Sequence, residues 1–131
     1  MIQEIEFILY VADQKKSKDF YSFVLNLSPS LDVEGMTEFL IGKNCKLGLM
    51  PEKGIANILM NKTPHPASGS GIPRCEIYLK IEDCSGYLSR AVDAGGKLIS
   101  EFALRDWGDN VAYISDPDGH IIAFAEINKE S

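Results

Sequence analysis

Residues 6–13 read EFILYVAD, and a related pattern returns at residues 76–83 as EIYLKIED. Each copy begins with glutamate, continues with mostly apolar residues and ends with aspartate. The copies start 70 residues apart, at about half the length of the chain. An internal repeat at this distance predicts two copies of one structural unit. Short apolar runs that contain β-branched residues are typical of strands, so each half is expected to open with a strand.

A helical pattern follows each copy of the repeat. Over residues 17–27, apolar side chains recur at spacings of three and four, and residues 84–96 show the same spacing. In the second segment, Gly95 and Gly96 supply the left-handed stop that is typical of a helix C-terminus. We therefore expect one helix after each opening strand.

Further strands are expected after each helix. The strand-like segments are residues 36–42 and 45–51 in the first half, and 97–102, 110–115 and 120–127 in the second. A glycine-containing turn joins the first two segments as a hairpin. The plan is therefore βαβββ twice, and the predicted fold class is α+β.

The two halves, about residues 1–51 and 74–131, are expected to share one core and to form a single domain over residues 1–131. Residues 52–73 join them. The last part of this segment, KTPHPASGSGIP, is rich in proline, glycine and serine, which predicts a flexible connector. Residues 54–60 could form a short helix within it.

Period-two alternation assigns the two faces of each opening strand. The sets expected against the helices are entirely apolar: Phe7, Leu9 and Val11, and Ile77, Leu79 and Ile81. The opposite sets are mixed: Glu6, Ile8 and Tyr10, and Glu76, Tyr78 and Lys80. We expect the mixed sets to line a cleft between the halves, where a small organic ligand would bind.

Composition excludes several classes of partner. The net charge is −6 and the pI is about 4.8, which argues against nucleic acid or an anionic membrane as partner. No apolar run approaches the ~20 residues of a membrane span, and no signal peptide is visible. The three cysteines have no zinc-like spacing, so we expect reduced thiols in a cytoplasmic protein.

The ending RDWGDNVAYISDPDGHIIAFAEI, residues 105–127, together with the repeated strand-helix opening, resembles the vicinal-oxygen-chelate superfamily. This family includes glyoxalase I, extradiol dioxygenases, and the fosfomycin and bleomycin resistance proteins. The resemblance covers essentially the whole chain. It implies two βαβββ modules that form a cupped, partly closed barrel, usually assembled as a homodimer.

The resemblance also implies a metal site to be tested. Enzymes of this family generally hold one divalent metal ion through side chains on the opening and closing strands of both halves. The opening-strand positions correspond to Glu6 and Glu76, and the closing-strand positions to Gly48 and Ala123. Since glycine and alanine offer no donor atom, we expect no metal cofactor; the alternative is one divalent ion held by Glu6 and Glu76.

Glu6 and Glu76 are also the candidate catalytic residues. If one of two carboxyl groups in a cleft has a raised pKa, the pair can act as an acid or a base. The alternative is that both are solvated residues at the rim of the cup.

Six residues are the candidate ligand contacts: Tyr113, Trp107, Tyr78, Tyr10, Arg105 and Lys80. Tyr113 matches a ligand-facing tyrosine of the related fosfomycin resistance enzymes, and alternation turns Val111 and Ser115 to the same face. Trp107 could stack on a planar ligand, or it could be a packed corner residue. Arg105 could anchor an anion, or it could pair with a nearby aspartate.

Two functions follow from these observations. We expect a protein that binds a small organic ligand in the cleft, without the full metal site of the family. The alternative is a glyoxalase-related enzyme that acts on a small oxygenated substrate with a divalent metal. It would be a lyase or isomerase like lactoylglutathione lyase, or a thiol transferase.

Overall fold

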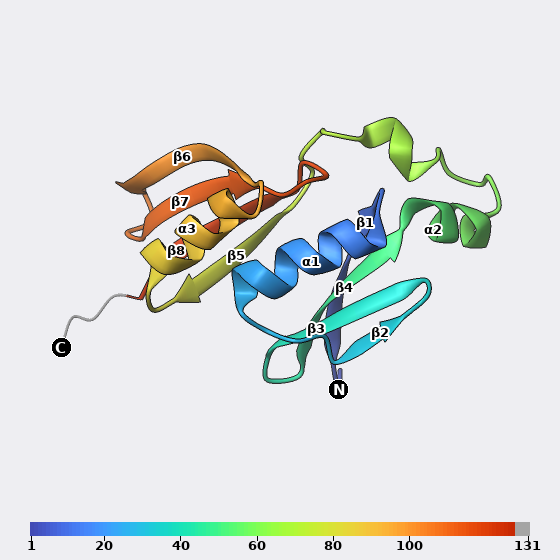
Figure 1. The fold of residues 1–131 in the computed structure, drawn as a ribbon, viewed down its shortest axis with the longest axis horizontal. Coiled ribbons are helices and arrows are strands. Elements are labelled where there is room, and N and C mark those ends of the chain that lie inside the picture. Colours follow the sequence, from blue (N-terminus) through green and yellow to red (C-terminus); the bar gives the residue numbers. More distant parts are fainter. Residues whose placement is uncertain (128–131) are drawn as a thin grey trace. The chain divides into compact units, whose positions relative to one another are not determined.

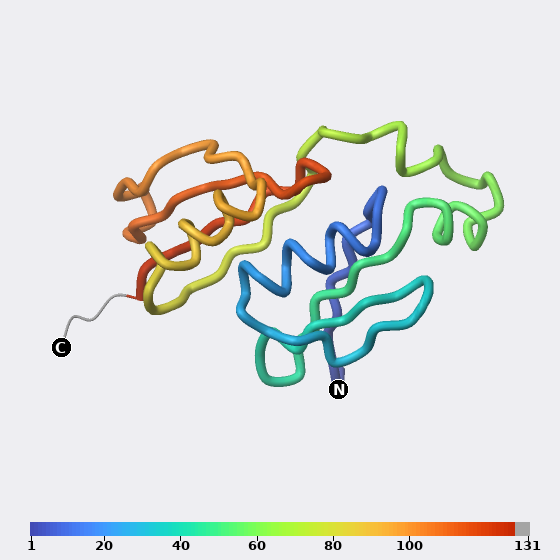
Figure 2. Tube along the Cα trace, in the orientation of Figure 1, coloured from blue at the N-terminus to red at the C-terminus, as the bar shows by residue number. Residues whose placement is uncertain are grey.

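The computed structural model describes residues 1–127, which form two compact units. The first unit comprises Met1–Ser22 and Asn26–Ser70; the second starts at Gly71 and also takes in Phe23–Leu25. Each unit contains one four-stranded sheet (Figure 1). Figure 2 allows the chain to be followed through both. That the units share one core as a single domain stays a prediction.

The first sheet has the strand order β1-β4-β3-β2, with β1 parallel to β4 and the other pairs antiparallel. Its elements are β1 (Ile5–Val11), α1 (Gln14–Leu25), β2 (Leu31–Val33), β3 (Met36–Gly42) and β4 (Cys45–Pro51). β1 and β2 are therefore the edge strands of this sheet.

The second sheet repeats this plan, with the order β5-β8-β7-β6 and β5 parallel to β8. Its elements are β5 (Glu76–Ile81), α3 (Cys84–Asp93), β6 (Lys97–Leu104), β7 (Asn110–Ser115) and β8 (Ile121–Glu126). The sequence prediction of two βαβββ modules in the α+β class is confirmed.

The connector contains more regular structure than its composition indicates. The expected short helix is present as α2 (Glu52–Leu59), and a 3-10 helix, η1, covers Pro66–Gly69. Whether the connector is flexible stays a prediction. Within residues 1–127, no helix combines the length and the apolar character that crossing a membrane requires.

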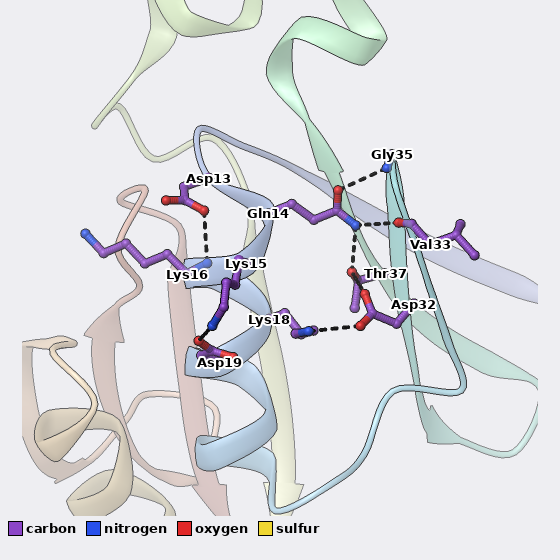
Figure 3. Close-up of polar contacts among 10 residues, drawn as sticks. All are labelled: Asp13, Gln14, Lys15, Lys16, Lys18, Asp19, Asp32, Val33, Gly35 and Thr37. Carbon is purple, nitrogen blue, oxygen red and sulfur yellow. Dashed lines mark hydrogen bonds and ion pairs between the residues drawn. The ribbon is translucent and has the colours of Figure 1, made fainter.

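α1 begins earlier than the sequence predicts, at Gln14 rather than Ser17. The reason is Asp13, the last residue of the repeat, which caps the helix: its side chain accepts a hydrogen bond of 3.1 Å from the backbone N–H of Lys16 (Figure 3). Such a cap satisfies one of the free N–H groups at a helix start. The left-handed stop predicted after the second helix is confirmed, because Gly95, just beyond the end of α3, has φ +100°.

Gln14 ties the start of α1 to the hairpin of β2 and β3 (Figure 3). Its Nε2 donates to the carbonyl of Val33 at 2.8 Å and to Thr37 Oγ1 at 2.9 Å, while its Oε1 accepts from the N–H of Gly35 at 3.0 Å. Thr37 is fully buried and donates to Asp32, which pairs with Lys18 at 2.9 Å. One amide side chain thus satisfies three groups of the hairpin.

Replacing this amide should weaken the first unit measurably. We expect Gln14→Ala to lower the free energy of unfolding by about 2 kcal/mol, because it removes three hydrogen bonds and leaves the buried Thr37 hydroxyl with fewer partners. Lys15→Ala is the matched control, since Lys15 forms an exposed ion pair with Asp19, and it should change stability by less than about 0.5 kcal/mol. Urea unfolding followed by circular dichroism measures both; equal effects would contradict the role of Gln14.

Alternation places only part of the core of each sheet as the sequence predicts. The expected core residues of β5 are half-buried: Ile77, Leu79 and Ile81. Leu9 and Val11 are buried, and the fully buried Thr37, which Gln14 of α1 contacts, shares their face of the first sheet. The prediction for Phe7 is wrong: this residue was expected in the core, but it is 61% exposed. It lies on the edge strand β1, which has a neighbouring strand on one side only.

In the second sheet, the face against α3 carries Phe124, whose ring lies 5.9 Å from that of Tyr87 on the helix. Ala112 and Ile114 are buried, and alternation places them on this face, as predicted. The opposite face, which we call the open face of the second sheet, carries Tyr78, Lys80, Val111, Tyr113, Ala123 and Ala125.

Candidate functional site

Several predicted ligand contacts meet on the open face of the second sheet. The indole N–H of Trp107 donates to the hydroxyl of Tyr78 at 2.8 Å, and that hydroxyl donates to a carboxylate oxygen of Asp109. The other oxygen of Asp109 pairs with the ammonium of Lys80 at 3.4 Å. We call these four residues the Trp107–Tyr78 cluster.

The cluster forms because a strand and a tight turn meet. Alternation along β5 places Tyr78 and Lys80 on one face. Residues 105–109 turn back sharply: Arg105 N–H bonds to the Asp109 carbonyl at 2.8 Å, and Gly108 N–H to the Arg105 carbonyl at 2.9 Å. Gly108 has φ +98°, a conformation that favours glycine. The turn brings Trp107 and Asp109 to the tyrosine.

Burial and hydrogen bonding shift the pKa values of two residues in the cluster. Burial, and then the bond to Asp109, raise the pKa of Tyr78 above its usual value. The bond from Tyr78, together with the charge of Lys80, lowers the pKa of Asp109. At neutral pH the tyrosine is therefore a phenol and the aspartate a carboxylate, which makes Tyr78 a hydrogen-bonding group rather than a base.

Arg105 does not extend into solvent as an anion anchor. Its guanidinium lies 5.1 Å from the ring centre of Tyr113, a cation–π distance. It also donates to the Val111 carbonyl at 2.8 Å, to Ser100 Oγ at 3.0 Å and to the Glu101 carbonyl at 2.9 Å. Neither nearby aspartate, at 106 or 109, forms an ion pair with it among the described contacts. Arg105 thus holds Tyr113 and the neighbouring strands in place.

Ala123 lies between the two tyrosines in the sheet register, paired with Tyr78 on one side and Tyr113 on the other. It is fully buried in an apolar cluster with Val111 and Ala125, and Tyr113 packs against this cluster. Val111 shares the open face as predicted but is covered. The position that would carry a metal-binding glutamate is therefore filled by apolar packing.

In the first unit, Glu6 leans across the neighbouring strand β4. A Cβ atom placed on Gly48 would lie 2.4 Å from Glu6 Oε2 and 3.0 Å from Ile8 Cγ1. The absence of a side chain at Gly48 therefore makes room for the carboxyl group. Glu6 Oε2 is buried without a hydrogen-bond partner.

Burial first, and then the neighbouring Glu38 carboxyl group, raise the pKa of Glu6 from its usual 4.5 to about 7. Lys46 acts in the opposite direction. A neutral carboxyl next to a carboxylate is a chemically competent acid at neutral pH. The carboxyl partner of Glu6 within its own sheet is thus Glu38, which the sequence analysis did not identify. Alternation along residues 36–42, which places Glu38 opposite to the buried Thr37 and Phe39, was the signal available.

This raised pKa predicts how stability depends on pH. Between about pH 4.5 and pH 7 the folded chain binds more protons than the unfolded chain at Glu6, so its contribution to stability falls as the pH rises and is constant above pH 7. We expect Glu6→Gln to remove this part of the dependence, while Glu76→Gln retains it. Thermal unfolding midpoints at pH 5, 6, 7 and 8 test this, and parallel curves for the wild type and Glu6→Gln would contradict it.

The remaining predicted residues lie apart from these groups. Glu76 is the first residue of β5 and is exposed. Tyr10 is on β1, 40% exposed, on the same face as Glu6 by alternation. Glu6 and Glu76 belong to different units, so the predicted carboxylate pair stays a prediction.

One further group of potential metal ligands occurs among residues 1–127. Atoms of Asp116, Asp118 and His120 lie within 4.8 Å of one another. The Asp116 carboxylate accepts hydrogen bonds of 2.9 Å from the N–H groups of Asp118 and His120, and it contacts His120 Nδ1 at 2.8 Å. These contacts organise the turn between β7 and β8.

Comparison with known proteins gives a family match over most of the chain. Residues 2–124 match the model of the Glyoxalase/Bleomycin resistance protein/Dioxygenase superfamily. A comparison with curated proteins found none that matches.

Solved structures share the fold. A glyoxalase-related enzyme from Fulvimarina pelagi aligns with a TM-score of 0.80 and 18% identity, over 97% of this chain and 89% of that chain. The hypothetical protein SA1046 from S. aureus aligns with a TM-score of 0.74 and 25% identity, over 97% and 95%. A glyoxalase/bleomycin resistance protein/dioxygenase family enzyme from Burkholderia phytofirmans PsJN aligns with a TM-score of 0.76 and 15% identity, over 94% and 97%.

Proposed function

The chain belongs to the Glyoxalase/Bleomycin resistance protein/Dioxygenase superfamily, and from this premise we propose that it binds a small organic ligand without a divalent metal. We place the ligand against the open face of the second sheet. The observation that carries this proposal is the Trp107–Tyr78 cluster, which fixes two exposed aromatic rings beside one cation.

The cluster has the properties of a preorganised contact surface. Trp107 is 59% exposed and Tyr78 36%, although hydrogen bonds hold both rings in position. Aromatic rings that are already fixed lose little conformational freedom on binding, and their faces favour planar ligand groups. The Lys80 ammonium, paired with Asp109 at 3.4 Å, retains N–H groups that can bind a ligand oxygen.

The side chains at the four positions where the resemblance implies metal ligands support binding without a metal. Neither Gly48 nor Ala123 has a donor atom; Glu6 fills the space above Gly48, and apolar packing surrounds Ala123. Two carboxylates alone are a poor set for a transition metal.

A glyoxalase-related enzyme is the second candidate, and Glu6 is the observation that favours it. A carboxyl group with a pKa of about 7 can donate or accept a proton at neutral pH. Turnover separates the two functions: the methylglyoxal–glutathione hemithioacetal and fosfomycin with a thiol are tested with and without a chelator. Product formation that Glu6→Gln abolishes would favour the enzyme.

Ligand binding can be followed directly, because Trp107 is the only tryptophan of the chain. A panel of small oxygenated compounds is screened by its fluorescence, and calorimetry then measures the affinity of each compound that binds. We expect Trp107→Ala to weaken binding at least about tenfold and Tyr78→Phe to weaken it less, whereas Lys15→Ala should leave it unchanged. Unchanged affinity in both site variants would contradict the assignment.

We also propose that the protein is a cytoplasmic homodimer. The family resemblance supports the dimer, and three cysteines without a disulfide suit a reducing compartment. Light scattering coupled to size-exclusion chromatography tests the dimer, and a monomer at micromolar concentration would contradict it.

A further inference from the structure

Three glutamates and one lysine gather on the face of the first sheet that lies opposite to the buried Leu47 and Leu49. Lys46 is on β4, between β1 and β3, and pairs in register with Glu6. Its ammonium lies 3.1 Å from Glu4 Oε1 and 3.7 Å from Glu38 Oε1. We call Glu4, Glu6, Glu38 and Lys46 the first-sheet cluster.

The missing side chain at Gly48 shapes this cluster. Gly48 lies two residues after Lys46 on β4 and is paired with Glu38 on β3. Because no Cβ blocks the space, the Glu6 carboxyl group reaches over β4 on the face that also carries Glu38. Glu4 and Glu38 therefore share the ammonium as partner, whereas Glu6 Oε2 is buried beside them without a hydrogen-bond partner.

We propose that the Lys46 ammonium is the resident cation of the first-sheet cluster and keeps its carboxyl groups from binding a divalent metal ion. This inference assigns a role to Lys46 that the proposed function does not contain, and it rests on the metal-free part of that proposal.

Charge and geometry support this role. A lysine ammonium is charged at neutral pH, and that of Lys46 lies 3.1 Å from Glu4 Oε1 and 3.7 Å from Glu38 Oε1. A cation that entered among these oxygens would meet this charge within a few ångströms, where repulsion is strong in a partly buried site.

The test measures Mn²⁺ binding by calorimetry and electron paramagnetic resonance on the full chain. Lys46→Met removes the charge but keeps most of the aliphatic side chain, and Lys46→Arg keeps the charge. We expect no stoichiometric Mn²⁺ on the wild type or Lys46→Arg at about 1 mM, and at least about tenfold tighter binding to Lys46→Met. Adding Glu6→Gln to Lys46→Met should abolish this gain.

Lys80→Met is the matched control, because Lys80 also pairs with an acidic residue on the open face of its own sheet. It should show no gain in Mn²⁺ affinity. Circular dichroism verifies folding, and Lys46→Gln replaces Lys46→Met if the latter does not fold. A folded charge-removed variant that binds Mn²⁺ no better than the wild type overturns the inference.

The outcomes also separate this inference from the proposed function. One Mn²⁺ bound per wild-type chain and lost in Glu6→Gln overturns both. One Mn²⁺ bound per wild-type chain and retained in Glu6→Gln overturns only the metal-free function, since the metal then lies outside the first-sheet cluster.

Discussion

Ala123→Glu is expected to lower the free energy of unfolding by about 3 kcal/mol or more, and not to create a metal site. Ala123 is fully buried, and Val111, Ala125 and Tyr113 surround it. The substitution restores the side chain that the family resemblance implies at this position. Arg105 Nε and Nη2 already donate to Ser100 and to backbone carbonyls, so the introduced carboxylate would be buried largely among apolar side chains.

Two controls separate charge from volume in this experiment. Ala123→Val adds volume without polarity and should cost about 1 kcal/mol through overpacking. Lowering the pH to about 5 should recover part of the loss in Ala123→Glu, since protonation removes the buried charge. Urea unfolding of both variants at pH 5 and pH 8 measures the loss of stability caused by volume and the loss caused by charge. Wild-type stability of Ala123→Glu, or a stoichiometric metal bound to it, would show that Tyr113 leaves room for a ligand at this position.

The fold was predictable from the sequence because its signals are local. Two copies of a strand followed by a helical pattern are visible in the repeat at residues 6–13 and 76–83, and the strand boundaries of β3, β4 and β7 follow from alternation and turns. β2 has only three residues, too few to show alternation. The start of α1 was missed because Asp13, part of the repeat, is also the helix cap.

The candidate site was predictable only in part. Alternation and the resemblance indicated Tyr78, Lys80, Arg105, Trp107 and Tyr113, and all five lie in the second unit at or beside its open face. Their role in binding stays a prediction. Asp109 was missed as the shared partner of Tyr78 and Lys80, because its contacts reach residues about 30 positions away in sequence. Long-range partners depend on which strands pair and in which register, and neither follows from local periodicity.

The surroundings of the two positions at which the resemblance implies a metal ligand, Gly48 and Ala123, differ between the units. In the second, apolar side chains pack around Ala123. In the first, a polar cluster with its own cation occupies the space above Gly48. Substitutions at the two positions should therefore fail for different reasons: loss of apolar packing at one, and crowding of carboxylates at the other.

Gly48→Glu is expected to lower the free energy of unfolding by about 3 kcal/mol, a loss similar to that expected for Ala123→Glu. Its Cβ would displace Glu6 Oε2, which lies 2.4 Å from that position, and its carboxylate would join Glu4, Glu6 and Glu38. Gly48→Ala brings the steric conflict without the charge, so it should cost about 1 kcal/mol.

A double-mutant cycle locates the cause of this loss. If Glu6 is the group that Gly48 accommodates, combining Glu6→Ala with Gly48→Ala should cost less than the sum of the two single changes, with a coupling of about 1 kcal/mol. Ile8 Cγ1 lies 3.0 Å from the same Cβ position, so its steric conflict with Gly48→Ala remains when Glu6 is replaced. Unfolding free energies of the four proteins at pH 7 give the coupling. Additive effects would mean that Gly48 is required by the strand itself, and that Glu6 occupies the space without depending on it.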